Sequence, residues 1–89
     1  MLEKPVLIVN EKGLHARAAA KFVSVASTFQ SEIHLANGYQ QANGKSIMGM
    51  MMLAASRGTI LKLRIQGKDQ ESALETLERL IADRFGEES

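Results

Sequence analysis

The sequence predicts an α+β open-faced sandwich, in which three helices cover one face of a four-stranded antiparallel sheet in the order βαββαβα. Two long segments repeat apolar residues every three or four positions, which is typical of amphipathic helices. Short apolar or alternating runs lie before, between and after these segments, which is typical of strands. Placing all the helices on one face of a single sheet buries every apolar stripe at once.

The first strand and the first helix are predicted from the apolar pattern near the N-terminus. The aliphatic run Val6–Val9 indicates a strand, and Pro5 suits its first residue because proline lacks a backbone N–H. Asn10–Gly13 indicates a turn. Helical spacing then predicts a helix from Ala16 to about Thr28. The apolar stripe of this helix consists of Ala19, Phe22, Val23, Ala26 and Phe29.

A hairpin is expected in the middle of the chain. The alternation over Ser31–Leu35 predicts a strand with Ile33 and Leu35 pointing inward. Asn37–Gly38 favours a tight turn, because a type I′ turn needs positive φ and these residues adopt it readily. The returning strand is expected over Tyr39–Asn43.

A short helix and a fourth strand are expected next. Ser46 is a good N-cap for a helix that runs through about Ala55. Gly58 is expected to end this helix in the left-handed conformation. The alternation over Thr59–Ile65 predicts the fourth strand.

A last helix is expected after Gly67, with Asp69 or Ser72 as its N-cap. Because the tail from Gly86 to Ser89 is short and polar, we expect it to be frayed. The buried stripe of the last helix consists of Ala73, Leu74, Leu77, Leu80 and Ile81.

Length and composition favour one domain that spans residues 1–89. The net charge is +1, without a block of like charges, so a nucleic-acid partner is not expected. The chain has no cysteine and only two histidines, so no metal site is expected. The longest apolar run, Ile47–Ala55, is too short to span a membrane, for which about 20 residues are needed. A cytoplasmic protein is therefore expected.

The segment Gly13-Leu14-His15-Ala16-Arg17 is the candidate functional centre. His15 lies at the expected helix start, where unpaired N–H groups and the helix dipole favour an anion. Arg17 lies in the first turn, where a cation opposes that dipole, which suggests that an anion binds there. Its guanidinium suits phosphate oxygens, and a neutral imidazole is a nucleophile. The pentapeptide therefore predicts a site that can hold a phosphoryl group covalently.

Two segments resemble one known family. Residues Gly13 to Val23 are similar to the active-site segment of HPr, the histidine-containing phosphocarrier of the bacterial phosphoenolpyruvate-dependent phosphotransferase system, and Gly44 to Met51 resembles its regulatory-serine segment. The resemblance implies that His15 is phosphorylated at Nδ1 with help from Arg17. It implies a stoichiometric carrier that needs no cofactor and is a monomer. This carrier would relay the phosphoryl group from Enzyme I to Enzyme II A-type proteins, in sugar uptake or its regulation.

The resemblance leaves two questions open. Ala18 stands where the family usually has proline, and we expect this to change stability or transfer rate only slightly. Ser46 is expected to cap its helix, and the family's serine is phosphorylated where a matching kinase exists. A serine kinase or phosphorylase is therefore a further expected partner. The alternative function is a regulatory member of the nitrogen-related branch that acts mainly by binding proteins and is switched at Ser46.

The methionine-rich helix is expected to contribute a docking surface. A small domain rarely buries a helix on every side, and exposed apolar patches with flexible methionines mark binding sites. If Met50, Leu53 and Ala54 face the core, the outward residues are Ile47, Met48 and Met51. Two lysines, Lys21 and Lys45, either surround the site with positive charge or are ordinary solvated surface residues.

Overall fold

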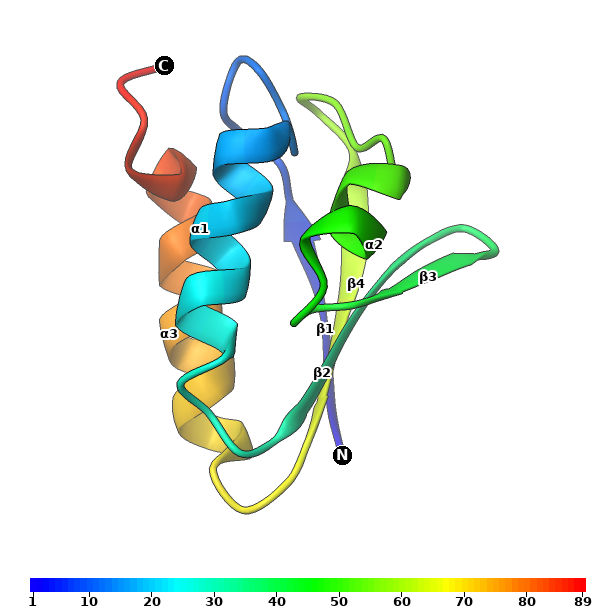
Figure 1. Cartoon of the computed structure of the whole chain (residues 1–89), viewed down its shortest axis with the longest axis vertical. Helices are drawn as coiled ribbons and strands as arrows, with labels where there is room; N and C mark the ends of the chain where they lie inside the picture. The colour runs from blue at the N-terminus through cyan, green and yellow to red at the C-terminus, as the bar shows by residue number, and fades with distance from the viewer.

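The computed structural model describes residues 1–89 and shows an open antiparallel sheet with its helices on one face (Figure 1). The strands lie in the order β1-β4-β2-β3, and every neighbouring pair is antiparallel. The predicted fold class and element order are confirmed. The elements are β1 (Leu2–Leu7), α1 (Ala16–Ala26), β2 (Glu32–Asn37), β3 (Gln40–Asn43), α2 (Ile47–Met52), β4 (Ile60–Gln66), α3 (Gln70–Ala82) and the short 3-10 turn η1 (Arg84–Gly86).

One hydrophobic core lies between the sheet and the helices. In the sheet, Leu63 of β4 pairs with Leu35 of β2, and both side chains are at most 1% exposed. Phe22 of α1, Met50 of α2 and Leu77 of α3 close over them and are fully buried. Each such side chain contributes roughly 1.5–3 kcal/mol to folding. No helix is long and apolar enough to cross a bilayer.

The first strand and the hairpin differ from the predicted ones. β1 covers Leu2–Leu7, so Pro5 lies inside the strand and pairs with Lys62. This is possible because β1 is an edge strand, where a missing N–H disturbs no second neighbour. Asn37 belongs to β2, and the two-residue turn is Gly38–Tyr39, in which only Gly38 has positive φ.

Helix α2 ends earlier than predicted. Its last residue is Met52. The left-handed residue that follows its C-terminus is Ala54, with a φ of 51°, and not Gly58 as predicted. The early end allows the chain to turn back, so that the Ala55 carbonyl accepts a hydrogen bond of 2.8 Å from the N–H of Leu14. Gly58 lies in the turn before β4 and donates to the Ile8 carbonyl at 2.8 Å.

Asp69 links the start of α3 to the loop that follows α1. It is the N-cap residue of α3, but its carboxylate does not cap that helix. It accepts hydrogen bonds from the N–H groups of Gln30 (2.8 Å) and Ser31 (2.9 Å) and from the Ser31 hydroxyl. The hydrogen bond from the Ser31 side chain, followed by that from the Gln30 backbone, lowers the pKa of Asp69. The α1–β2 loop is thereby attached to the start of α3.

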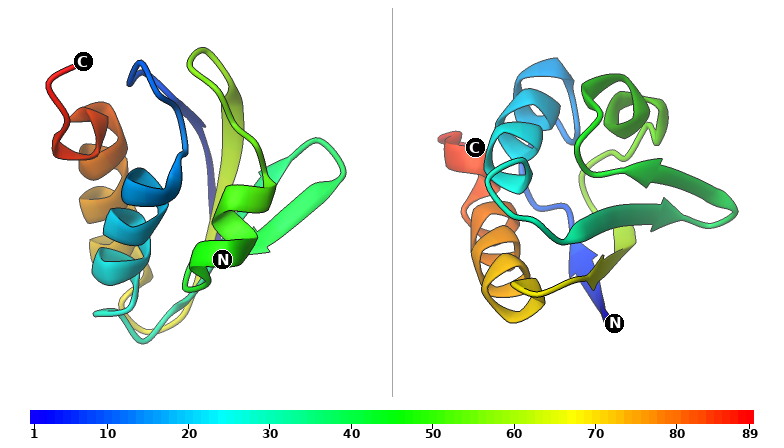
Figure 2. Two further views of the ribbon diagram at one scale, coloured as in Figure 1. Left: turned by 45° about the horizontal axis from the view of Figure 1, so that its top comes forward. Right: turned by 60° about the horizontal axis from the view of Figure 1, so that its bottom comes forward.

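The predicted fraying of the C-terminal tail is wrong. After α3 the chain turns through Arg84 and Phe85, which both have positive φ, and the Phe85 side chain is only 5% exposed. The N–H of Glu11 donates to the Ser89 carbonyl at 3.0 Å. The buried aromatic ring explains the order, because it attaches the tail to the core. In Figure 1 and in the left view of Figure 2, the tail lies at the same end of the molecule as the start of α1.

Candidate functional site

His15 is the N-cap residue of α1 and has an extended backbone. Its side chain does not cap the helix. The first helical hydrogen bond runs from the N–H of Ala19 to the His15 carbonyl, at 2.8 Å. The N–H groups of Ala16, Arg17 and Ala18 precede this bond and have no backbone partner. With no acidic residue in the first turn, the helix start keeps its affinity for an anion.

The loop before His15 is held against the segment that follows α2. Gly13 has a φ of 67°, and a Cβ atom there would lie 2.5 Å from the Ala55 carbonyl oxygen. Leu14 is 5% exposed and donates its N–H to the same carbonyl. The Asn10 side chain, fully buried, donates to the Gly13 carbonyl at 2.8 Å. These contacts determine where the His15 ring lies.

A carboxylate contacts the His15 ring. The Nε2 atom of His15 hydrogen bonds to Oε2 of Glu87, and Oε1 of Glu87 accepts from Nδ2 of Asn10 at 3.0 Å. Burial by itself would raise the pKa of Glu87, but the hydrogen bonds from Asn10 and His15 outweigh it and lower that pKa. Sequence reasoning missed both Asn10 and Glu87. The one usable signal was Phe85, an aromatic residue just beyond the last helix that could have predicted a docked tail.

His15 and Arg17 lie in one surface depression with a volume of about 370 Å³. Lys12 lines the same depression, and Glu87 and other tail residues form its opposite wall. The His15 side chain is 28% exposed, so the ring can be reached from solvent. Arg17 is exposed and its guanidinium makes no hydrogen bond or ion pair within the protein. The depression therefore offers an accessible nucleophile and two cations next to the helix start with its unpaired N–H groups, and together these suit a phosphoryl group.

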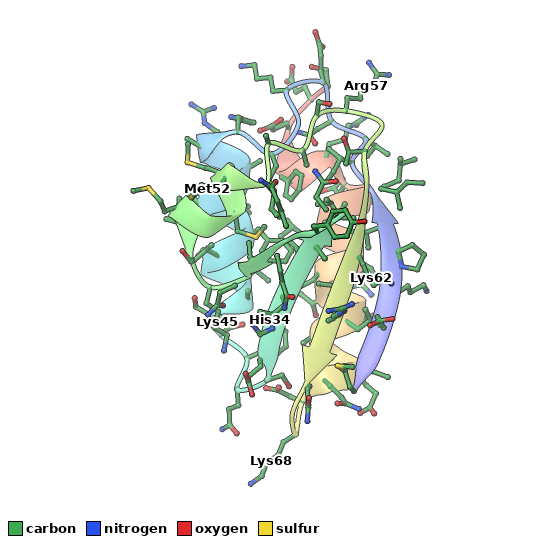
Figure 3. The ribbon with its side chains drawn as sticks, turned by 90° about the vertical axis from the view of Figure 1, so that its right-hand side faces the viewer. His34, Lys45, Met52, Arg57, Lys62 and Lys68 are labelled. Carbon is green, nitrogen blue, oxygen red and sulfur yellow. The ribbon has the colours of Figure 1, made fainter.

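The three residues predicted to face outward on α2 are exposed: Met48 by 74%, Ile47 by 44% and Met51 by 42%. Met50 is fully buried and Leu53 nearly so, as expected. Ala54 is exposed, contrary to expectation, because the helix has already ended. The further exposed residue is Met52, at 72%, which the helical pattern missed. Met52, labelled at one end of α2 in Figure 3, lines a surface depression together with Gln40 and Gln41 of β3.

Helices α1 and α2 run antiparallel, so the two ends of α2 have different neighbours. At its start, the Lys45 ammonium donates to the Phe29 carbonyl at 2.7 Å, beyond the C-terminus of α1. Lys45 thus lies beyond the end of α1 opposite to His15, and this 11-residue helix is about 16 Å long. In Figure 3 Lys45 lies at the end of α2 opposite Met52. Lys45 therefore does not surround the His15 site, whereas Lys21 is an exposed residue of α1.

Ser46 occupies the predicted N-cap position of α2. Its backbone is extended, and its Oγ accepts a hydrogen bond of 3.0 Å from the N–H of Gly49. The side chain is half-buried, next to the exposed Ile47. The hydroxyl thus stabilises the helix start, a contribution of about 1 kcal/mol.

Known proteins match this chain in sequence and in fold. Residues 2–83 match the family model described as the PTS HPr component phosphorylation site. The phosphocarrier protein HPr of Xylella fastidiosa (strain 9a5c) is 46% identical over 89 residues, which cover 100% of both chains. That of Neisseria meningitidis serogroup A is 47% identical over 87 residues, 98% of each chain. A crystal structure of HPr-C-His from Thermoanaerobacter tengcongensis has a TM-score of 0.95, with 46% identity and 100% coverage of both chains.

Proposed function

This chain belongs to the HPr family of phosphocarriers of the phosphotransferase system, and we propose that it carries a phosphoryl group on His15 between donor and acceptor proteins. The observation that carries the proposal is the depression in which an accessible His15 ring meets the unpaired start of α1 and the unpartnered Arg17. The family membership predicted from two sequence segments is confirmed.

The residues of this depression have complementary chemical roles in the proposal. The Nδ1 atom of His15 attacks the phosphorus, and the Arg17 guanidinium binds the phosphoryl oxygens. The N–H groups at the helix start face the same negative charge. Phosphoryl transfer mainly requires that the protein position the reacting atoms and stabilise the negative charge of the phosphoryl oxygens, and these groups can do both. The chain would act as a stoichiometric carrier and not as a turnover enzyme.

The proposed donor is Enzyme I and the proposed acceptors are Enzyme II A-type proteins, with the chain acting as a cytoplasmic monomer. Both partners would dock on the exposed residues of α2 and the neighbouring start of α1. Met48 and Met51 are exposed although apolar, and flexible methionine side chains adapt to more than one partner. A relay needs this property, because one surface must fit a donor and an acceptor in turn.

Incubation with Enzyme I from the same cell and phosphoenolpyruvate tests the proposal. One acid-labile phosphate per chain is expected, and His15→Ala should accept none. The chain has only two histidines, so His34→Ala on β2 is the matched control and should be labelled like the unmodified chain. The proposal is wrong if competent Enzyme I leaves the chain unlabelled, or if the label persists in His15→Ala.

A regulatory role at Ser46 is the second candidate, favoured by the half-buried hydroxyl beside the exposed face of α2. A phosphate there would be tolerated by the helix N-terminus but would place negative charge beside the proposed docking surface. A serine kinase or phosphorylase would then switch partner binding. Mass spectrometry of the protein from native cells is the test: an unmodified Ser46 in every carbon and nitrogen source would contradict this role.

The acceptor proteins determine in which branch of the phosphotransferase system this chain works. We propose transfer to sugar-type Enzyme II A proteins, with the nitrogen-related branch as the alternative. Incubation of the phosphorylated chain with one acceptor of each type distinguishes them. Faster loss of the label to the nitrogen-type acceptor would favour the alternative.

A further inference from the structure

The His15 ring has a single polar side-chain partner, and that partner comes from the end of the chain. Glu87 contacts Nε2, while Nδ1 makes no hydrogen bond within the protein. From this contact, and resting on the proposed role of His15, we propose that Glu87 is a positioning residue that holds the ring proton on Nε2 and leaves the Nδ1 lone pair free to accept the phosphoryl group.

The direction of the hydrogen bond follows from the chemistry of the two groups. An ionised carboxylate can only accept hydrogen bonds. The hydrogen bonds that outweigh the burial of Glu87 lower its pKa and so keep this carboxylate ionised near neutral pH. The nitrogen that faces it must therefore carry the proton. In a neutral ring the other nitrogen, Nδ1, then has the lone pair.

The carboxylate is itself held in place on both sides. Its Oε1 atom accepts from Nδ2 of Asn10, and the same Nδ2 donates to the Gly13 carbonyl. Two acceptors around one atom identify it as the amide nitrogen of Asn10. Beyond this contact, buried Phe85 attaches the tail to the core and the Ser89 carbonyl accepts the N–H of Glu11. Glu87 is therefore oriented by groups that the phosphoryl group does not touch.

The transfer step is balanced without moving the ring proton. The Nδ1 lone pair forms the nitrogen–phosphorus bond while the bond from phosphorus to the donor atom breaks, and the electron pair of that bond stays on the donor atom. The ring of His15 gains one positive charge because Nε2 keeps its proton. The adjacent Glu87 carboxylate stabilises that charge. On transfer to an acceptor the pair returns to Nδ1, and the proton again stays on Nε2.

Replacing Glu87 with glutamine is the sharpest test, because it changes hydrogen-bond direction with almost no change in shape. Asn10 Nδ2 still donates, so the glutamine carbonyl oxygen must face Asn10. The glutamine amide group then faces Nε2 as a donor, and the ring must carry its proton on Nδ1. Glu87→Gln should therefore invert the tautomer of neutral His15, whereas Glu87→Ala should only mix the two tautomers. The matched control is Glu88→Gln, because Glu88 is exposed and makes no hydrogen bond.

The tautomer is measured on the full-length ¹⁵N-labelled protein from the chemical shifts of the two ring nitrogens. We expect protonated Nε2 in the unmodified protein and in Glu88→Gln, and protonated Nδ1 in Glu87→Gln. Transfer from Enzyme I should fall roughly tenfold in Glu87→Ala, the effect of one lost hydrogen bond to a charged group, and further in Glu87→Gln. The full-length variants are first compared by circular dichroism.

Three outcomes would overturn the inference. They are a neutral His15 ring with its proton on Nδ1 in the unmodified protein, the same tautomer in folded Glu87→Gln as in the unmodified protein, or an unchanged rate of phosphoryl transfer by Glu87→Gln. The nitrogen shifts are read without any partner protein. An unmodified chain that shows protonated Nε2 but accepts no phosphate would instead refute the proposed function.

Discussion

Replacing Gly13 with alanine tests how the loop before His15 is held. The new Cβ atom would lie 2.5 Å from the Ala55 carbonyl oxygen and 2.9 Å from the Cα atom of Ser56. Both neighbours are backbone atoms that cannot rotate away. The loop or the segment after α2 must therefore move, and the hydrogen bond from Leu14 to Ala55 must lengthen.

The expected loss of stability has two parts. Placing a Cβ on a residue with a φ of 67° costs about 1 kcal/mol. Relieving the backbone clash and weakening the Leu14 hydrogen bond should add roughly 2 kcal/mol. Gly38 is the matched control, because its φ of 63° is similar and no atom lies within 4 Å of its Cβ position. Gly38→Ala should therefore lose only about 1 kcal/mol.

Urea unfolding of both variants measures this difference, provided that their m-values agree. We expect Gly13→Ala to unfold at a clearly lower urea concentration than Gly38→Ala. It should also accept phosphate from Enzyme I more slowly, since the displaced loop carries His15. Equal losses of stability in the two variants would refute the argument, because the clash with Ala55 would then have no energetic effect.

Three further changes are predictable. Ala54→Gly should raise the free energy of unfolding by roughly 0.5 kcal/mol, because glycine removes the strain of a φ of 51°, and an unchanged or lower thermal midpoint would contradict this. Met48→Glu should raise several-fold the KM of Enzyme I for this chain as acceptor, and should change the free energy of unfolding by less than about 0.5 kcal/mol. Met50→Ala should instead lower the free energy of unfolding by about 3 kcal/mol, because Met50 is fully buried. An unchanged KM for Met48→Glu would exclude Met48 from the docking surface. The pKa of Asp69 is lowered by folding, so its stabilising contribution is present above its ordinary value of 3.8 and disappears as the pH falls through the lowered pKa. Asp69→Asn should therefore flatten the acid side of the stability profile measured by urea unfolding, and an unchanged profile would rule out this contribution.

Local patterns in the sequence were sufficient for the long elements. The helical spacing around Phe22 and Leu77 predicts α1 and α3, because only one face of each helix meets the core. The alternation around Ile33 predicts β2 for the corresponding reason in a sheet. His15 and Arg17 could likewise be placed at a helix start, because an N-cap is defined within a few residues of sequence.

The departures occur where a distant segment decides the local conformation. The start of β1 is decided by pairing with β4, and the end of α2 by the contact between Ala55 and Leu14. Neither neighbour is visible in the local pattern. Ala54, for example, adopts a left-handed conformation against its own preference between Leu53 and Ala55, which are both buried.

The sequence by itself determined the fold class, the family and the two residues, His15 and Arg17, that the proposal assigns to phosphoryl transfer. Only the tertiary structure revealed that Glu87 contacts the His15 ring across a separation of 72 residues. Periodicity reports which face of an element is buried and cannot report which distant group meets it. That pairing depends on Phe85, whose burial in the core brings the end of the chain back to the start of α1.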